Sequence, residues 1–312
     1  MKSLKLNSKN YLHIIELYAE WLQTLGYAAK TVYILPIHLR EFFYYLESKG
    51  IYTLEEFTIQ HTNDYYTYIQ QRKNTRFDNA LSNASINSHR RMLRSFCDYL
   101  RQSGRMVLPA LTINCLDDTK EKLNTLTEPE IKLLFKATYS IDDIQQIGRP
   151  LLGERDRAML SVLYGCALRR TEAMSLNTED VNTEKQILHV RKGKNYKERL
   201  VPINKIYLQY IEDYIYNSRY TLLNGLNSPA LFISQQRKRI TDQSINLRLK
   251  LLARHTGNQA LINKNPSLHT LRHSIATHLL HKGVQLEHIA KFLGHSSLES
   301  TQVYTHLAEQ QQ

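Results

Sequence analysis

The amino-acid sequence predicts a mainly α-helical protein of two domains, with one small antiparallel sheet in the second. Its 312 residues exceed what a single hydrophobic core usually organises. Apolar residues recur at helical spacing through the first hundred residues, and only two short β-like runs, 187–190 and 199–203, interrupt the later helical patterns. We therefore expect an N-terminal helical domain at residues 1–108, a linker at 109–125 and an α-rich C-terminal domain at 126–312.

Four helices are expected in the N-terminal domain. Three cover residues 11–25, 31–48 and 54–71, and Gly26 and Gly50 follow the first two as stops. The fourth covers 84–100, where one helical face collects Ile86, His89, Leu93, Phe96 and Leu100.

The C-terminal domain begins with a helix start signal. After Gly104 the periodicity lapses, and Thr127 with Glu130 then forms a capping box. Helical patterns follow at 130–137, 155–165 and 170–175. The two β-like runs come next, separated by a turn rich in Lys, Gly and Asn, and helices dominate after Pro202.

The charge indicates a polyanionic partner. Lys and Arg number 41 against 29 Asp and Glu, a formal charge of +12. Residues 72–105 hold eight basic and only two acidic residues, and Arg90, Arg91 and Arg94 lie in the fourth helix. We interpret them as candidate contacts to DNA phosphates, with a merely solvated, solubilising face as the alternative.

Membrane insertion and disulfide bonding are not expected. No apolar run reaches 18 residues, and Glu16 and Glu20 interrupt the first helix where a signal peptide needs an apolar stretch. The three cysteines are widely spaced and odd in number, so they form neither a disulfide framework nor a zinc site. We expect a cytoplasmic protein with reduced thiols and no membrane partner.

The last fifty residues carry the candidate chemistry. His269 and Arg272 lie three apart and therefore share a helix face; Ser267 can cap that helix and Gly283 can end it. A second helix at 285–293 stops at Gly294 and leaves His295 at a junction, and Tyr304 follows on a short third helix. Bases, a guanidinium and a phenol brought together in this way suit phosphoryl transfer through a covalent tyrosyl ester.

Two other interpretations of these residues remain open at this stage. His and Tyr at helix ends commonly pack or cap. The crowded histidines also suggest a metal site, comprising His269, His273, His278, His281, His288 and His295. Against a zinc hydrolase or a two-metal nuclease, no H-E-x-x-H occurs and carboxylates are scarce after Leu261.

An ordered set of motifs resembles the tyrosine recombinase (phage integrase) family, most closely its compact Xer-type members. The motifs are LHTLRH at 268–273, LGHS at 293–296, TQVYTH at 301–306, RDRA at 155–158, ALRRTE at 167–172 and GKNYKERLVP at 193–202. Their order and spacing agree over most of 127–306. The resemblance implies a core-binding (SAM-like) helical bundle at 1–108 and the tyrosine recombinase catalytic fold at 126–312.

The resemblance implies a six-residue catalytic set, namely Arg169, Lys194, His269, Arg272, His295 and the nucleophile Tyr304. The arginines would stabilise charge on the phosphate, Lys194 would protonate the departing 5′-oxygen, and His269 would assist deprotonation of Tyr304. His295 would hydrogen-bond a phosphate oxygen. No cofactor, metal ion or ATP is expected.

Other residues are expected to bind DNA or to support the site. The resemblance suggests duplex contacts from Arg237, Lys238 and Arg239, while Lys197 and Arg199 would face DNA or solvent, and Glu172 would hold its region in place. The expected partners are duplex DNA with paired recombination sites and a tetramer of recombinase subunits, homo- or heteromeric.

The predicted function is site-specific cutting and rejoining of DNA through a 3′-phosphotyrosyl intermediate. A type IB topoisomerase would share this chemistry but relax supercoils without pairing sites. A catalytically silent DNA-binding accessory protein is the third hypothesis, disfavoured because all six catalytic positions are filled.

Overall fold

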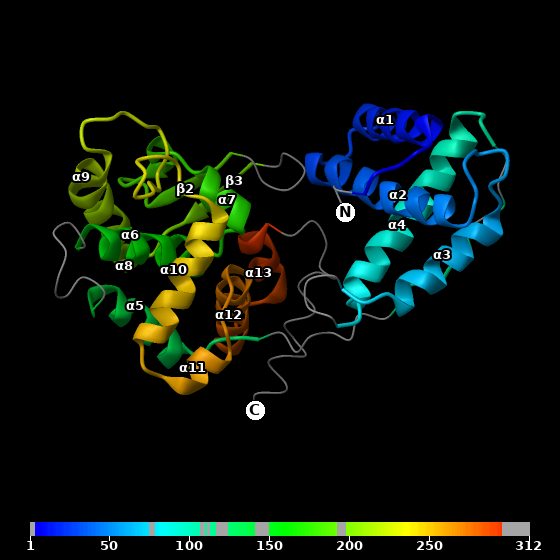
Figure 1. Cartoon of the computed structure of the whole chain (residues 1–312). Helices are drawn as coiled ribbons and strands as arrows, with labels where there is room; N and C mark the ends of the chain where they lie inside the picture. The colour runs from blue at the N-terminus through cyan, green and yellow to red at the C-terminus, as the bar shows by residue number, and fades with distance from the viewer. Residues whose placement is uncertain are drawn as a thin grey trace. The chain divides into compact units, whose positions relative to one another are not determined.

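The computed structural model describes residues 4–74, 79–106, 109, 111, 113–116, 124–140, 150–191 and 198–294. The chain divides into two compact units, Met1–Glu121 and Lys122–Gln312 (Figure 1). The prediction of a mainly helical protein with a small antiparallel sheet is confirmed. Among the described residues, no helix combines the length and the apolar character needed to cross a bilayer.

The described part of the first unit forms four helices, α1 (Lys9–Thr24), α2 (Ala29–Ser48), α3 (Ile59–Gln71) and α4 (Asn83–Gln102). Ser8 and Ser82 cap α1 and α4 by accepting backbone N–H bonds. The helix expected at 54–71 begins only at Ile59. Glu56 accepts the N–H groups of Tyr52 and Thr53 and so closes a turn, which delays the helix start to the Thr58 cap.

The core of the first unit is rich in aromatic side chains. Tyr11 stacks on Phe43 with ring centres 4.1 Å apart, and Phe96 packs edge-on to Phe43. The apolar face predicted for α4 is buried. Part of the segment expected to be a linker also packs on this helix: the Asn87 side chain bonds both backbone groups of Leu116, and Arg90 Nε donates to the Ile113 carbonyl.

A buried polar network joins α2 to α4. Glu41 pairs with Arg72 at 2.9 Å, and the rings of His38 and His89 lie 4.0 Å apart. Burial lowers the pKa of His38 to about 4, with a smaller effect from Arg72 and Arg91. Burial, together with His38 and Arg72, lowers the pKa of His89 to about 3. Both imidazoles are therefore neutral at neutral pH.

The second unit contains the sheet and the remaining helices. Its helical elements are α5 (Glu128–Ser140), α6 (Pro150–Leu160), the π-helix η1 (Ser161–Gly165), α7 (Arg170–Ser175), the 3₁₀ turn η2 (Thr178–Asp180), α8 (Lys205–Asp213), the π-helix η4 (Tyr214–Ser218), α9 (Arg219–Leu223), α10 (Asp242–His255), α11 (Gln259–Asn263), α12 (Leu268–His281) and α13 (Leu286–Leu293).

The described strands form one antiparallel sheet in the order β1-β2-β3, from β1 (Val181–Asn182), β2 (Ile187–Val190) and β3 (Arg199–Pro202). Leu188 pairs with Val181 on one side and Val201 on the other. The buried side chains of Leu188, Val190 and Val201 join the main core of this unit. Both predicted β-runs are strands, and β1 is an additional two-residue strand.

Helix caps fix where α5 and α12 begin. Thr127 and Glu130 bond reciprocally, as the capping box predicts, and Ser267 caps α12. Leu126 N–H donates to Ser274 Oγ at 2.8 Å, which ties the start of α5 to the middle of α12. All three cysteines lie within the described residues and are free thiols, two buried and Cys115 exposed.

The histidine network predicts a pH dependence for the first unit. A histidine whose folded pKa lies below its unfolded value of about 6.5 stabilises the fold above that value, and this stability is lost as the pH falls through the folded pKa. Each such group contributes a slope of ~1.4 kcal/mol per pH unit. Burial also raises the pKa of Glu41, which acts with the opposite sign, so a variant must isolate the histidine contribution.

We expect His38→Gln to reduce the loss of unfolding free energy between pH 7 and pH 5. The only tryptophan, Trp21, lies in α1, so its fluorescence during urea unfolding reports on this unit. His13→Gln, at an exposed position of α1, should leave the slope unchanged. Equal slopes for wild type and His38→Gln would show that His38 is not held neutral by burial.

Candidate active site

Arg169 and Arg272 meet at the carboxyl end of α13. Arg169 is the N-cap residue of α7, and Arg272 lies in the second turn of α12. Arg169 Nη2 donates to the Gly294 carbonyl at 2.7 Å, and Arg272 Nη2 donates to the Leu293 carbonyl at 2.6 Å. Both guanidiniums are therefore anchored to consecutive residues at this helix end. The last carbonyls of a helix attract cations, so this placement is electrostatically favourable.

The backbone before Arg169 has an unusual shape. The π-helix η1 ends at Gly165, and Ala167 then adopts a φ of +52°, a conformation that costs a residue with a Cβ about 1 kcal/mol or more. The Ala167 carbonyl accepts a bond from Arg272 Nη1. Gly165 packs so closely on Tyr207 that an added Cβ would lie 2.4 Å from its ring. These contacts fix the path of the chain into Arg169.

His269 lies one helical turn before Arg272 and is exposed. Its pKa is lowered by partial burial and by the charges of Arg170, Arg272 and Arg169, so the imidazole is neutral at neutral pH. A neutral imidazole is able to accept a proton. Behind it, burial and the charges of His269 and Arg272 lower the pKa of His273 to about 4.

Glu172 joins Arg169 to the sheet. Its carboxylate, only 1% exposed, accepts bonds from Arg169 and from Arg199, the first residue of β3. Burial alone would raise the pKa of Glu172, but the bonds and charges of Arg199 and Arg169 lower it to about 2. The carboxylate is therefore ionised at any physiological pH, and the residue holds its region in place as expected from the sequence.

Arg199 departs from its expected role as a DNA or solvent contact. Its side chain is 14% exposed, and it binds Glu172 through both terminal nitrogens. It also lies against Gly294, whose φ is +65°: a Cβ at this position would come within 2.9 Å of Arg199 Nε. No local pattern identified Arg199, because its partner is 27 residues earlier in the chain. The only indication in the sequence is Glu172 itself: an acid among basic residues, if buried, needs cations to compensate its charge, and Arg199 supplies the second one.

Four of the predicted site residues lie outside the described part of the chain: Lys194, Lys197, His295 and Tyr304. The two strands that precede and follow residues 192–197 in the sequence are described, as is Gly294 immediately before His295. The structure therefore brings together Arg169, His269 and Arg272 from the predicted catalytic set.

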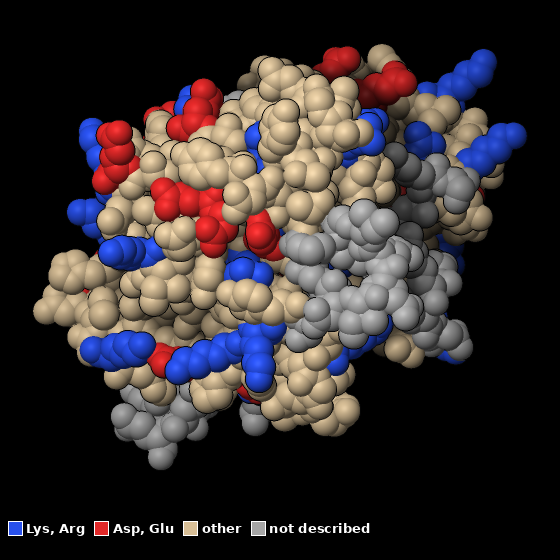
Figure 2. Space-filling model, turned by 90° about the vertical axis from the view of Figure 1, so that its left-hand side faces the viewer, with Lys and Arg blue, Asp and Glu red and all other residues tan. Residues whose placement is uncertain are grey.

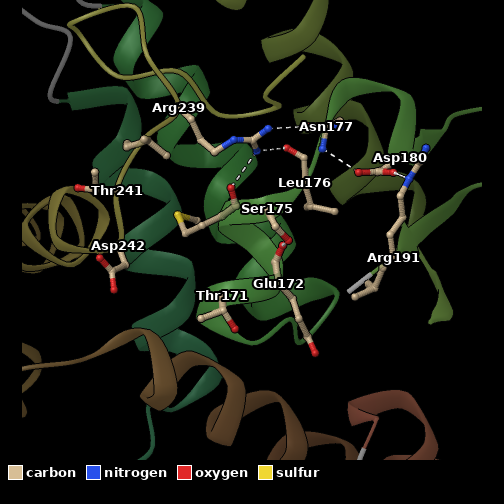
Figure 3. A pocket seen from close by; sticks show the side chains of 13 residues that line it. Thr171, Glu172, Ser175, Leu176, Asn177, Asp180, Arg191, Arg239, Thr241 and Asp242 are labelled. Carbon is tan, nitrogen blue, oxygen red and sulfur yellow. Dashed lines mark hydrogen bonds and ion pairs between the residues drawn. The ribbon is translucent and has the colours of Figure 1, made fainter. Parts of the chain in front are cut away.

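The predicted DNA contacts differ in how free their side chains are. Arg91 and Arg94 are exposed on α4, whereas Arg90 bonds a backbone carbonyl. Arg237 and Lys238 are exposed in the turn that follows Ile233. Arg239 instead bonds the carbonyls of Met174 and Leu176 and the Asn177 side chain, so it caps the end of α7 (Figure 3).

A pocket of about 650 Å³ lies beside α7 (Figure 3). Its lining carries both signs of charge, with Arg191 and Arg239 on the basic side and Glu172, Asp180 and Asp242 on the acidic side. Glu172 contributes to its wall, and Asp180 pairs with Arg191. The pocket therefore lacks the excess of positive charge that an anionic ligand would need.

Basic and acidic side chains are interspersed on the face of the molecule in Figure 2. The surplus of +12 is therefore not gathered on that face. This agrees with the uneven distribution along the sequence, where residues 72–105 hold a large share of it.

One group of described residues could bring three metal-ligand atoms together, namely His38, Glu41 and His89 in the first unit. Two features fit a buried polar network better than a metal site. Arg72 already neutralises Glu41, and the two imidazole rings are only 4.0 Å apart. A tetrahedral zinc ion ~2.0–2.1 Å from a nitrogen of each ring would hold the ring centres farther apart.

The chain is similar to known proteins in both sequence and structure. Residues 124–311 match the model of the phage integrase family. The chain is 40% identical over 218 residues to tyrosine recombinase XerD of Pseudomonas putida KT2440, covering 70% of this chain and 69% of that protein. It is 31% identical over 284 residues to XerD of Shewanella oneidensis, covering 91% and 88%.

Two solved structures share the fold. One is the XerH site-specific recombinase bound to difH substrate in a pre-cleavage complex, with a TM-score of 0.72, 17% identity, and coverage of 97% of this chain and 95% of that one. The other is a lambda integrase tetramer bound to a Holliday junction, with a TM-score of 0.63, 16% identity, and coverage of 95% and 78%.

We expect Glu172→Gln to lower the free energy of unfolding of the second unit by about 3 kcal/mol, because it leaves two partly buried guanidiniums without their anion. The folded pKa of Glu172 lies below the ordinary value of 4.5, so the contribution is present above that pH and is lost as the pH falls toward 2. Calorimetry of the whole chain measures the loss, and Trp21 fluorescence identifies the transition of the other unit.

Glu128→Gln is the matched control. The Glu128 carboxylate pairs with a single cation, Lys282, and both side chains are largely exposed. The variant should therefore lose less than ~1 kcal/mol of unfolding free energy. Equal losses for the two variants would contradict the structural role of Glu172.

Proposed function

The chain belongs to the phage integrase family, and we propose that it is a site-specific recombinase that cuts and rejoins duplex DNA through a 3′-phosphotyrosyl intermediate. The proposal rests on two guanidiniums, Arg169 and Arg272, that are anchored to consecutive backbone carbonyls, with His269 one helical turn before Arg272. This is the arrangement that a phosphodiester under nucleophilic attack requires.

The two arginines would stabilise the transition state. Attack on phosphorus concentrates negative charge on the non-bridging oxygens, and guanidiniums match those oxygens in geometry as well as charge. Both arginines are held before substrate arrives, Arg272 by two backbone carbonyls and Arg169 by Glu172 and Gly294. Groups fixed in this way need little rearrangement during the reaction.

Tyr304 would supply the nucleophile. Its phenol oxygen attacks phosphorus, the bond to the 5′-oxygen breaks, and the product is a 3′-phosphotyrosyl ester with a free 5′-hydroxyl. His269 would take up the phenol proton, and Lys194 would protonate the departing oxygen. His295 would donate to a phosphate oxygen. Attack by a second 5′-hydroxyl reverses these steps, so the ester conserves the bond energy and rejoining needs no ATP.

The partners follow from the relatives and from the charge. XerH is described on a DNA substrate and lambda integrase as a tetramer on a Holliday junction. We infer that this chain pairs two DNA sites as a tetramer, with exposed Arg91, Arg94, Arg237 and Lys238 among its contacts to DNA, together with Lys197. It would act where chromosomal or mobile DNA is accessible, in the cytoplasm.

We expect Tyr304→Phe to abolish covalent protein–DNA adducts on a nicked suicide substrate, because phenylalanine has no hydroxyl to attack phosphorus. DNA binding, measured by gel shift, should change little. Denaturing electrophoresis of the trapped complex detects the adduct. Adduct formation by Tyr304→Phe at the wild-type level would overturn the assignment of the nucleophile.

Adduct formation, plasmid relaxation and strand exchange, measured side by side, separate the alternative functions. A type IB topoisomerase would relax a supercoiled plasmid that carries no recombination site, and a silent accessory protein would bind DNA without forming an adduct. A site-specific recombinase forms the adduct only on its own site and exchanges strands only when two sites are present.

We expect DNA affinity to fall steeply with salt. Replacing both Arg91 and Arg94 with Ala should lower the slope of log K against log salt by about 2, because each phosphate contact releases about one counterion. The loss should be similar for specific and unrelated duplexes. Fluorescence anisotropy over a salt series measures the slope, and an unchanged slope would remove α4 from the DNA interface.

A further inference from the structure

We propose that Arg199 is a positioning residue for DNA cleavage: it holds Glu172, and through Glu172 it fixes Arg169 against the scissile phosphate. The inference rests on the proposed recombinase function. It assigns a role within that site to a strand residue outside the predicted catalytic set.

The carboxylate of Glu172 is fully shared between two arginines. Oε1 accepts Arg169 Nη1 at 2.8 Å and Arg199 Nη1 at 2.9 Å. Oε2 accepts the Arg169 backbone N–H at 2.8 Å and Arg199 Nη2 at 2.8 Å. A carboxylate has about four acceptor positions, so these bonds occupy it. The plane of the carboxylate is therefore set by Arg199 as much as by Arg169.

Arg169 is held both at its backbone N–H and at its two terminal nitrogens. Glu172 holds its backbone N–H and one terminal nitrogen, and the Gly294 carbonyl holds the other. Arg199 contacts both supports, since it binds Glu172 and packs against Gly294. Removing the Arg199 side chain would free the carboxylate to rotate and open space beside Gly294, so that Arg169 would lose its fixed orientation.

The charges favour a positioning role over direct DNA binding. Two guanidiniums share one carboxylate, so the group keeps a net charge of +1 near the phosphate. Arg199 directs both terminal nitrogens to Glu172 and is mostly buried, whereas Arg169 retains more exposure and also reaches Gly294. Lysine cannot reproduce the two-pronged contact, because its ammonium is a single point charge.

Arg199 also begins β3, directly after the segment that contains Lys194. A competing role is therefore support of the leaving-group step that Lys194 is proposed to perform. A substrate with sulfur in place of the bridging 5′-oxygen distinguishes the two. The phosphorus–sulfur bond breaks to give a thiolate that needs no proton, so this substrate bypasses a defect in the general acid but not a defect in Arg169.

The experiment measures single-turnover cleavage by the full-length chain on suicide duplexes with 5′-oxygen or 5′-sulfur at the scissile bond. The variants are Arg199→Ala, Arg199→Lys, Lys194→Ala and a matched control, Arg248→Ala. Arg248 binds a buried carboxylate, Asp156, in the same unit but does not contact Arg169. Thermal unfolding is measured first, so that all rates are compared where every variant is folded.

We expect both Arg199 variants to cleave the oxygen substrate at least tenfold more slowly than wild type, with DNA affinity within about threefold. The sulfur substrate should restore Lys194→Ala but neither Arg199 variant. Arg248→Ala should lose stability and keep the wild-type cleavage rate.

Three outcomes would overturn the proposal. A cleavage rate for Arg199→Ala equal to that of Arg248→Ala would make Arg199 purely structural. Rescue of Arg199→Ala by sulfur would place its effect on the leaving group. A loss of DNA affinity matching the loss of rate would make it a DNA ligand. If wild type forms no adduct on either substrate, the proposed function itself fails, which is a separate result.

Discussion

The ionised carboxylate of Glu172 is the constraint on which the candidate site depends. A carboxylate with 1% exposure is stable only when cations and hydrogen bonds compensate its lost hydration, and here two arginines do so. Those arginines come from the start of α7 and the start of β3, so the sheet, α7 and the end of α13 are fixed relative to one another. The geometry of the candidate site is thus set by one buried charge and its partners.

The backbone conformation at two residues also holds the arginines in place. Ala167 and Gly294 both have positive φ, and each lies where a carbonyl turns toward a guanidinium: Ala167 toward Arg272 and Gly294 toward Arg169. Glycine adopts this conformation at little cost, but Ala167 does so only because its surroundings compensate the strain. The two arginines therefore occupy positions that the backbone prepares, which suits groups that must meet developing charge without rearranging.

Local signals in the sequence were sufficient for much of the fold. The sequence predicts the helix at 170–175, the strand at 187–190 and the Thr127 capping box, because caps, periodicity and turn residues act within a few positions. The contacts that build the site are not local. Arg199 meets Glu172 across 27 residues and Arg169 meets Gly294 across 125, so spacing alone could not reveal either pair. Likewise, Arg90 and Arg239 look like free basic residues in the sequence, yet both bond backbone carbonyls of distant segments.

In the proposed reaction, Arg169 and Arg272 together bind the phosphate that Tyr304 attacks. A crystal structure of the full chain on its duplex site with orthovanadate would test this most directly, because vanadate adopts the five-coordinate geometry of phosphorus under attack. We expect vanadium bonded to the Tyr304 oxygen, both guanidiniums donating to its equatorial oxygens, and Glu172 still bridging Arg169 and Arg199. Vanadium bonded to another side chain, or an Arg169 turned away from it, would show that these residues do not form the catalytic site.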